Sequence, residues 1–246
     1  MKNIAFIPAR LNSSRFFRKV LFEIEGKTML QRVYEGSITD KLDQIFITTC
    51  DEEIADHARD IGASVIMTSN KHKRCLDRVA EAYQKLEVKS LEDNIICIQG
   101  DEPLIDKDFV NYFLDSHLEN KYDFSVASVQ IESVKEFQDP DIVKIIWNES
   151  KRMVYTSRQP IPHMEYFESK NAWKIFGMFG FKPKALMLFN SLEPSFLENI
   201  EQCDTNRICG SELLSQYVIP YETKNSYQAI DNKENLERVI RILKNK

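Results

Sequence analysis

The stretch IFITTCDEEIADHARDIGASVIMT, residues 45–68, decides the fold class. It begins with a β-branched run at 45–49, which is typical of a strand. A helix follows, with Asp51 as a candidate N-cap and Gly62 at its end, and a second strand is expected at 64–68. Parallel neighbours need a crossover connection of this kind. The stretch therefore predicts a strand–helix–strand unit with parallel strands.

The same alternation continues on both sides of this unit. Residues 3–8 form a short apolar run that ends in a proline, and residues 28–38 have helical apolar spacing. Residues 95–98, IICI, are continuously apolar, as expected for a central parallel strand, and residues 106–118 again have a helical pattern. We therefore predict an α/β protein with a doubly wound, mostly parallel sheet.

The pattern changes after residue 123, where strand-like segments follow one another without helices of comparable length. We expect an α/β core at 1–123, a small antiparallel subdomain at 124–182, and a return to the core at 183–246. A closing helix is expected at 233–246. Its cations are expected to form its solvated face and to complement the helix dipole; they are Arg238, Arg241, Lys244 and Lys246.

Composition excludes several classes of protein. The 246 residues are 43% hydrophobic and 29% charged, which is ordinary for a globular chain. No apolar run approaches the ~20 residues that span a bilayer, and the N-terminus has no signal-peptide pattern. The five cysteines have no metal-ligand spacing. With a formal charge of −5 and no basic tract, we expect a cytoplasmic protein that binds neither membrane nor nucleic acid.

A cation-rich loop, IPARLNSSRFFRK at 7–19, follows the first strand directly. Ligands of open α/β sheets bind beyond the carboxyl ends of the strands. The loop could therefore concentrate positive charge around a triphosphate, although it could equally be a polar surface loop. It contains neither GxxxxGK[ST] nor GxGxxG, so a P-loop protein or a dinucleotide-binding dehydrogenase is a poor interpretation.

Carboxylates follow the IICI strand and precede the closing helix. Gln99 and Asp101 should reach the same edge of the sheet as the first loop, and a carboxylate there suits Mg²⁺. The alternative is that Asp101 caps a turn before Pro103. Asp231 could supply a second carboxylate, or it could be an N-cap or turn former.

Two helices carry weaker signals. Arg78, after Asp77, could form an ion pair or helix cap, or it could contact a base or phosphate. Glu201, Asp204 and Arg207 share one helix face, which indicates a solvated charge face or, alternatively, contact with an acceptor sugar. The four histidines form no local pair, and nothing indicates a Ser-His-Asp or Cys-His nucleophile.

In this order, these segments resemble the sugar cytidylyltransferases, and most of all the 3-deoxy-manno-octulosonate (Kdo) cytidylyltransferases, or CMP-Kdo synthetases. The matching motifs span nearly the whole chain, and their combination is specific. They are IPARxxSSRxxxK (7–19), QGDEP (99–103), DP…VK (139–144), YTSRQPIP (155–162), GMFGF (177–181) and ID (230–231).

The resemblance implies a Rossmann-like core with a small antiparallel dimerisation and sugar subdomain, a homodimer, and Mg²⁺ as cofactor. The reaction it implies is CMP transfer from CTP to a Kdo-like acid sugar, with release of pyrophosphate, for lipopolysaccharide or other cell-surface polysaccharide synthesis. The implied nucleotide-binding residues are Ala9, Arg10, Ser13, Arg15, Lys19, Arg78 and Gln99. The implied catalytic residues are Arg10, Lys19 and Asp101, the metal ligands are Asp101 and Asp231, and the sugar-binding residues are Arg158, Gln159 and Glu201.

Three elements depart from the family pattern. The family's Pro-Gly-Lys is Phe17-Arg18-Lys19 here, its HxSGTER element is HKRCLDR at 72–78, and its HIGIYGY strand is IFGMFGF at 175–181. The last change replaces one His and two Tyr by apolar side chains, which removes hydrogen-bonding groups. The alternatives are another surface sugar, of amino-Kdo or nonulosonate type, and a catalytically weakened nucleotide-binding protein. Some motifs also resemble the spore-coat polysaccharide (SpsF-type) branch.

Overall fold

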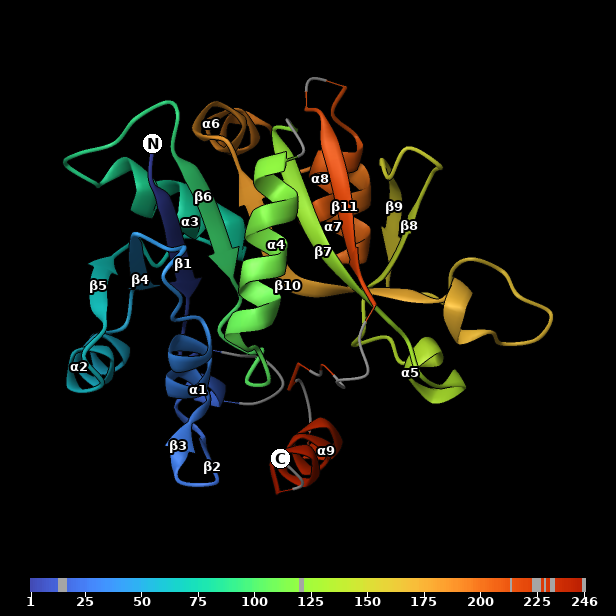
Figure 1. Ribbon diagram of the computed structural model, residues 1–246, viewed down its shortest axis with the longest axis horizontal. Coiled ribbons are helices and arrows are strands. Elements are labelled where there is room, and N and C mark those ends of the chain that lie inside the picture. The colour runs from blue at the N-terminus through green and yellow to red at the C-terminus, as the bar shows by residue number, and fades with distance from the viewer. Residues whose placement is uncertain are drawn as a thin grey trace.

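The computed structural model describes residues 1–12, 17–119, 122–212, 214–222, 227, 229–230 and 233–244. A nine-stranded sheet forms its centre, with strand order β11-β7-β10-β6-β1-β4-β5 and the β8–β9 hairpin attached to β10 (Figure 1). The strands are β1 (Asn3–Pro8), β4 (Gln44–Thr49), β5 (Ser64–Met67), β6 (Asn94–Ile98), β7 (Phe124–Gln130), β8 (Lys144–Trp147), β9 (Met153–Ser157), β10 (Trp173–Phe181) and β11 (Gln216–Tyr221). The strands β2 (Glu23–Ile24) and β3 (Lys27–Thr28) pair separately.

The predicted α/β sheet is confirmed. Strands β6, β1, β4 and β5 are parallel neighbours, and the unit predicted from residues 45–68 is β4, α2 and β5. The helices are α1 (Met29–Gly36), α2 (Glu52–Asp60), α3 (Cys75–Gln84), α4 (Lys107–Glu119), α5 (Val134–Gln138), α6 (Pro183–Ser191), α7 (Phe196–Glu201), α8 (Thr205–Cys209) and α9 (Lys233–Lys244), with short 3₁₀ turns η1 (Lys19–Leu21) and η2 (Ser169–Asn171). None of these helices is long and apolar enough to cross a bilayer.

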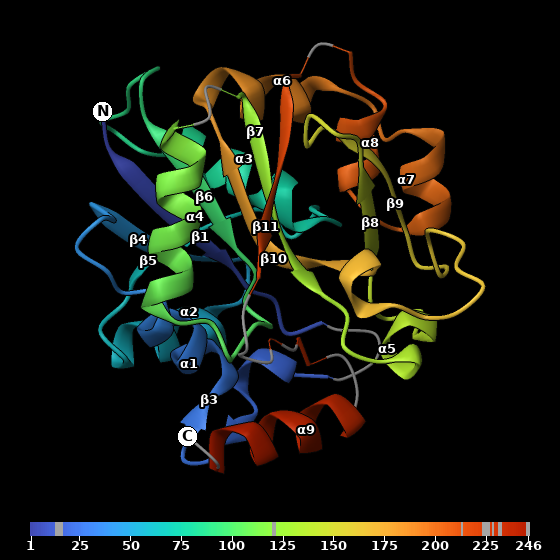
Figure 2. The same cartoon turned by 45° about the vertical axis from the view of Figure 1, so that its right-hand side comes forward.

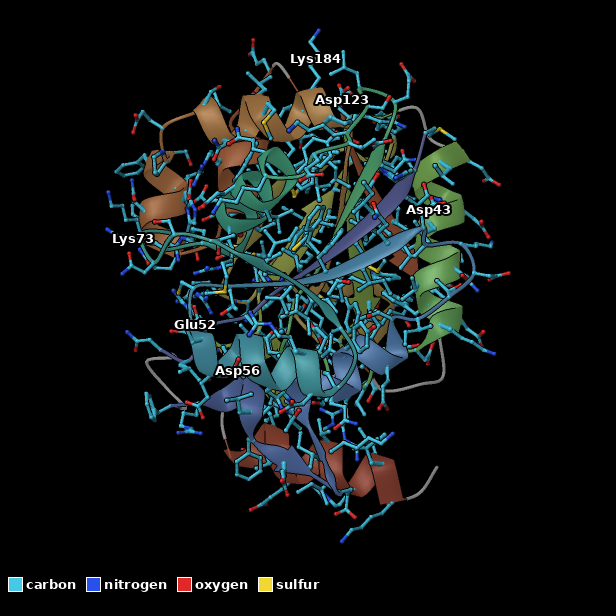
Figure 3. All side chains as sticks on the ribbon, turned by 90° about the vertical axis from the view of Figure 1, so that its left-hand side faces the viewer. Asp43, Glu52, Asp56, Lys73, Asp123 and Lys184 are labelled. Atoms are coloured by element: carbon cyan, nitrogen blue, oxygen red, sulfur yellow. The ribbon has the colours of Figure 1, made fainter. Side chains whose placement is uncertain are left out.

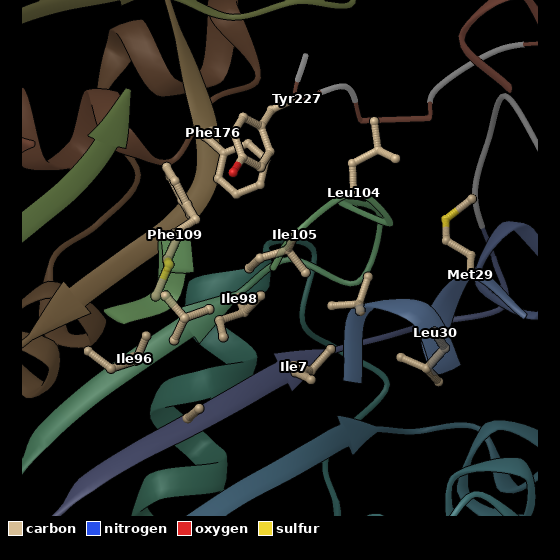
Figure 4. Packing of buried hydrophobic residues seen from close by; sticks show 14 of the residues in the cluster. Ile7, Met29, Leu30, Ile96, Ile98, Leu104, Ile105, Phe109, Phe176 and Tyr227 are labelled. Carbon is tan, nitrogen blue, oxygen red and sulfur yellow. The ribbon is translucent and has the colours of Figure 1, made fainter. Parts of the chain in front are cut away.

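Two hydrophobic clusters cover the two faces of the sheet because successive strand residues point to opposite sides. Ile96 and Ile98 belong to the cluster that includes apolar residues of α1 and α4, whereas Ile95 and Cys97 belong to the cluster of α3 and α6. Figure 4 shows part of the first cluster, and Figure 3 shows charged side chains such as Asp56 around the outside. The sheet is therefore covered by helices on both faces.

The segment 124–182 contributes to both the central sheet and its periphery. Strand β10 is antiparallel to β6 on one side and to β7 on the other. The β8–β9 hairpin joins the sheet through the pairing of β8 with β10, and α5 lies at the periphery of the molecule (Figure 2). The last described strand, β11, pairs in parallel with β7. The carboxyl ends of β1 and β6 consequently face the antiparallel part of the chain.

A buried histidine makes the fold sensitive to acid. His117 of α4 is 0% exposed, and burial, with a smaller contribution from Lys182, lowers its pKa to about 4. The unfolded chain therefore binds a proton between pH 6.5 and 4 that the folded chain excludes. We expect the free energy of unfolding to fall by about 3 kcal/mol over this range. Denaturant titrations at several pH values would measure the fall.

His117→Asn is the matching variant, because the amide can still bond the Ser125 hydroxyl, which lies 3.0 Å from His117 Nδ1. The variant is less stable at neutral pH, since it leaves a small cavity. Its unfolding free energy should nevertheless fall less steeply than that of the wild type between pH 6.5 and 4, where carboxylates with a lowered pKa, such as Glu136 and Glu201, still contribute to the fall. An equally steep fall in the variant would assign the acid sensitivity to other groups.

Candidate active site

Two adjoining cavities lie at the carboxyl ends of β1 and β6. The first, called the β1 cavity, has a volume of about 250 Å³ and is lined by the first loop and the start of α3. The second, called the β10 cavity, has a volume of about 220 Å³ and is lined largely by β10 and by the segments around Asp141 and Asp204. The cavities share four lining residues, which are Gln99, Asp101, Gln202 and Asp204. A group transferred from a ligand in one cavity to a ligand in the other would pass beside these four residues, called the shared wall.

The pair at the centre of this wall is Lys19 and Asp101. Lys19 opens η1 and is almost fully buried, and its ammonium donates to Asp101 Oδ2 at 2.8 Å. These residues follow the neighbouring strands β1 and β6, which explains how positions 82 apart in the chain meet. The neighbouring Arg18 forms an ion pair with Glu53 on α2.

The rest of the first loop extends the β1 cavity. Arg10 is exposed, lines this cavity, and donates from Nη1 to the Lys73 carbonyl at 3.3 Å. Ala9 is buried and lines the same cavity, and its backbone N–H donates a hydrogen bond to the Thr48 carbonyl at 2.9 Å. The predicted nucleotide-binding residues Ser13 and Arg15 lie outside the described residues.

Arg78 and Gln99 both line the β1 cavity. The buried Arg78 guanidinium donates to the Thr68 hydroxyl and, at 3.4 Å, to the Ser69 carbonyl. It therefore holds the turn after β5. The Gln99 side chain donates to Cys75 Sγ at 3.3 Å, which links β6 to the start of α3.

Of the three predicted sugar-binding residues, Arg158 lines a cavity and Glu201 holds Arg158 in place. Arg158 lines the β10 cavity, whereas Gln159 and Glu201 are not among the described residues lining it. The Glu201 carboxylate accepts from the Tyr155 and Ser157 hydroxyls and from the Arg158 N–H, at 2.7–2.8 Å. Burial raises the pKa of Glu201, but these hydrogen bonds outweigh it, and the pKa lies below its usual value.

Glu201 also fixes the arginine beside it. The Glu201 carbonyl accepts from Arg158 Nε at 2.9 Å, and the Pro140 carbonyl accepts from Arg158 Nη1 at 2.9 Å. Two segments thereby orient the guanidinium. Arg158 is a fixed cation at the β10 cavity.

Several charged residues that line the cavities were not among the predicted site residues, and Asp204 and Lys174 are two of them. Asp204 is 7% exposed and lines both cavities. Its carboxylate accepts a hydrogen bond from Cys75 Sγ at 3.4 Å, and burial raises its pKa. Because Asp204 and Arg207 are buried, the interpretation of their helix face as solvated is wrong. Lys174 lines the β10 cavity. A lysine inside the otherwise apolar strand WKIFGMFGF is the signal that could have revealed it.

Asp101 suits a magnesium ion. Mg²⁺ is usually held by one or two carboxylates together with substrate phosphates, and Asp101 borders both cavities. Within the described ranges no group of three or more His, Cys, Asp or Glu side chains forms a cage. The second predicted ligand, Asp231, lies outside the described residues, but the N–H of its neighbour Ile230 donates to the Asp101 carbonyl at 3.1 Å. The chain thus passes Asp101 just before position 231.

Gly177 fixes the position of Gln99 in the shared wall. The Gln99 N–H donates to the Gly177 carbonyl at 2.7 Å, and the Gly177 N–H donates to Glu102 at 3.0 Å. A Cβ at position 177 would lie 2.5 Å from Gln99 Oε1 and 2.7 Å from Gln99 Cβ. We expect Gly177→Ala to cost about 1–3 kcal/mol of stability and to weaken ligand binding in both cavities.

Denaturant titration and ligand-induced thermal shifts would measure both effects. Gly210→Ala is the matched control, because its Cβ would meet only ordinary contacts beyond 3.4 Å. Equal behaviour of the two variants would contradict the proposed close approach at Gly177.

Comparisons with known proteins agree with this geometry. A family model described as cytidylyltransferase matches residues 4–225. The 3-deoxy-manno-octulosonate cytidylyltransferase of Fusobacterium nucleatum is 33% identical over 99% of this chain and 98% of its own length. The enzyme of the same name from Thermodesulfovibrio yellowstonii is 33% identical over 96% of each chain.

A solved structure has the same architecture over its whole length. It is described as CMP:2-keto-3-deoxy-manno-octonic acid synthetase complexed with CTP, with a TM-score of 0.85, 27% identity and coverage of 100% of this chain and 99% of that chain. A cytidylyltransferase from Leptospira borgpetersenii, at 18% identity and a TM-score of 0.66, shares the fold. The resemblance drawn from the motifs is confirmed: the chain belongs to the cytidylyltransferase family, beside the 3-deoxy-manno-octulosonate cytidylyltransferases.

Proposed function

We propose that this protein transfers CMP from CTP to Kdo, or to a closely related acid sugar, and releases pyrophosphate. The observation that carries the proposal is the wall shared by the two cavities, which contains Asp101. On one side stand cations suited to a triphosphate, and on the other stand cations suited to a sugar carboxylate. The relatives named for this reaction support the same assignment.

In the proposed reaction CTP occupies the β1 cavity. Arg10 and Lys19 line it, and charge-assisted hydrogen bonds from such groups are the strong contacts to phosphate oxygens. A sugar hydroxyl in the β10 cavity attacks the α-phosphorus, losing its proton as the new oxygen–phosphorus bond forms. The bond to pyrophosphate breaks on the opposite side, where Arg10 and Lys19 offset the charge that develops. Positioning and electrostatics supply the catalysis.

Asp101 is the proposed magnesium ligand, with Asp231 as the second. When bound, the ion would polarise the phosphate oxygens and neutralise part of their charge. In the apo arrangement Lys19 compensates the Asp101 carboxylate at 2.8 Å. The pairing holds the Asp101 carboxylate in place at the shared wall.

The acid-sugar assignment rests on the cations of the β10 cavity. Arg158 and Lys174 line it, together with an apolar wall of Ile175, Phe176 and Phe179. Carboxylates such as those of Glu102 and Asp141 line it as well. We propose that the cations hold the carboxylate and that the apolar wall packs against carbon-bound hydrogens of the sugar. Because this wall lacks the family's imidazole and phenol groups, an amino-Kdo or a nonulosonate is the alternative acceptor.

The test is pyrophosphate release with Mg²⁺ and CTP, using Kdo first and then other acid sugars. Release with Kdo supports the proposed reaction. Release with another acid sugar alone would keep the mechanism and move the specificity to β10. No release, combined with no thermal shift by CTP, would favour the catalytically weakened binding protein.

We also propose that the protein works in the cytoplasm as a homodimer, in lipopolysaccharide or related surface-polysaccharide synthesis. Five free cysteines are compatible with a reducing compartment. Sedimentation analysis at micromolar concentration would test the dimer.

A further inference from the structure

Lys174 lies at the floor of the β10 cavity in an unusual setting. It is 7% exposed on β10 and lines the cavity. Its ammonium lies 3.5 Å from Glu136 Oε1, on α5. A buried lysine costs solvation free energy unless an opposite charge compensates it. Lys174 therefore depends on Glu136 when the cavity holds no anion.

Glu136 is itself held by several groups. It is 5% exposed, its Oε2 accepts from the Glu132 N–H at 2.9 Å, and the Ser133 hydroxyl accepts from its own N–H at 3.2 Å. The last two contacts form a capping arrangement at the start of α5. Its Oε1 also accepts from Arg238 Nη1, on α9. One buried carboxylate is thus shared between Lys174 and Arg238.

The charge state of Glu136 follows from these contacts. Burial raises its pKa, but Lys174, the Glu132 N–H and Arg238 together outweigh burial, so that the pKa lies below the usual value. Glu136 is consequently anionic at neutral pH. The row Lys174, Glu136, Arg238 carries charges of +1, −1 and +1.

Arg238 is held in place by the packing of α9. Val239, next to it on α9, is buried in the core cluster. Arg238 Nη2 also contacts Glu132 Oε2 at 2.9 Å. At the C-terminal end of α9, the Lys244 ammonium lies 3.5 Å from Glu25 Oε1. Figure 2 shows α9 extending from the region of α5 to that of β3. Arg238 is 29% exposed and is joined to α5 by these contacts, whereas Arg241 and Lys244 are exposed, as expected for the solvated face of the closing helix.

We propose that Glu136 and Arg238 are positioning residues for Lys174, and that together they set how strongly Lys174 holds the carboxylate of the acid sugar. The inference rests on the proposed function. Glu136 holds Lys174 and competes with the sugar carboxylate for it. Arg238 offsets part of the Glu136 charge and so leaves Lys174 available to the sugar.

The proposal predicts opposite effects from substitutions at Arg238 and at Glu136. In Arg238→Gln, Lys174 is the one remaining cation of the row and is held more strongly by Glu136. We expect KM for the acid sugar to rise by about 5–10-fold, because one charge interaction at a partly buried site has changed. In Glu136→Gln, Lys174 has no anionic partner in the row, and KM for the sugar should fall by about 3-fold or more. The dissociation constant for CTP should change less than about 2-fold in both.

A second readout needs neither CTP nor Mg²⁺. The thermal shift caused by the sugar alone should be larger than wild type in Glu136→Gln, because the sugar carboxylate compensates a destabilising buried charge, and smaller in Arg238→Gln. Arg238→Lys keeps the charge and should restore most of the wild-type KM. Arg241→Gln, on the exposed face of the same helix, is the matched control and should leave both readouts unchanged.

Wild-type turnover is measured first, and its absence with every acid sugar would refute the proposed function itself. With an active wild type, equal shifts of KM in the same direction for Arg238→Gln and Glu136→Gln would indicate a merely structural role and overturn the inference. If Arg238→Gln does not fold, Arg238→Lys and Glu136→Gln carry the test. A sugar-induced thermal shift in Glu136→Gln no larger than in wild type then overturns it.

Discussion

Asp101→Ala is expected to lower the rate of pyrophosphate release by about 10²–10³-fold at saturating substrates, the effect of removing one group that stabilises transition-state charge. Asp101 stands in the wall between the cavities, beside Lys19. Its loss removes the proposed magnesium ligand but leaves the cations of the β1 cavity in place. Steady-state kinetics with CTP and the preferred sugar would measure the change.

The same variant should behave differently toward CTP when Mg²⁺ is absent. The variant removes the Asp101 carboxylate from beside Lys19, and with it one negative charge that repels the phosphate oxygens, so CTP should bind without metal as tightly as in wild type or more tightly. Calorimetry in EDTA would show this. Asp108→Asn, an exposed acid on the neighbouring helix α4, should leave rate and affinity unchanged. Near-normal turnover of Asp101→Ala would refute the metal assignment.

Local patterns predicted the elements of the parallel half of the sheet. In β4–α2–β5 the β-branched run, the helix and Gly62 lie within 25 residues, so that neighbouring residues determine the structure. Position 51 is the N-cap, as predicted, but its carboxylate accepts from the Leu11 N–H at 2.9 Å rather than capping α2. A side chain that suits a cap locally serves the distant first loop instead.

The placement of β10 between β6 and β7 could not be predicted from the sequence. The pairing joins residues about 80 apart, such as Phe179 and Cys97, and no local pattern specifies it. For the same reason the Lys174 partner on α5 and the position of Asp204 in both cavities were missed. That Asp101 lies near the first loop was predictable, because the loop and Asp101 follow parallel strands whose carboxyl ends share one edge of the sheet.

Glu198→Ala should have the largest effect on stability, about 3–5 kcal/mol, because it removes two charge-assisted hydrogen bonds and leaves the buried Arg207 with Asp77 as its remaining carboxylate partner. The Glu198 carboxylate accepts from Arg207 Nε at 2.7 Å and Nη2 at 2.6 Å, and the two residues are 1% and 5% exposed. Arg207 also donates to Asp77 on α3 at 3.0 Å and lies over the Phe189 ring. Urea titration at pH 7 would measure the loss.

The double variant Glu198→Leu with Arg207→Met separates the charge from the packing. Replacing a buried pair by apolar side chains of similar volume is often neutral, whereas removing one partner is not. The double variant should therefore be more stable than Glu198→Ala, and Asp115→Asn, which disrupts the exposed pair with Lys41, should cost less than about 1 kcal/mol. A loss below 1 kcal/mol in Glu198→Ala would contradict the prediction.

The pair also bears on the site, because it joins α7 to α8 and, through Asp77, to α3. Helix α8 directly follows Asp204, and α7 ends at Glu201, which orients Arg158. Loosening this joint should therefore displace the shared wall as well as lower stability. Below its melting temperature, Glu198→Ala should show a raised KM for the sugar, whereas Asp115→Asn should not. An unchanged KM in a destabilised Glu198→Ala would show that the joint supports the fold without positioning the wall.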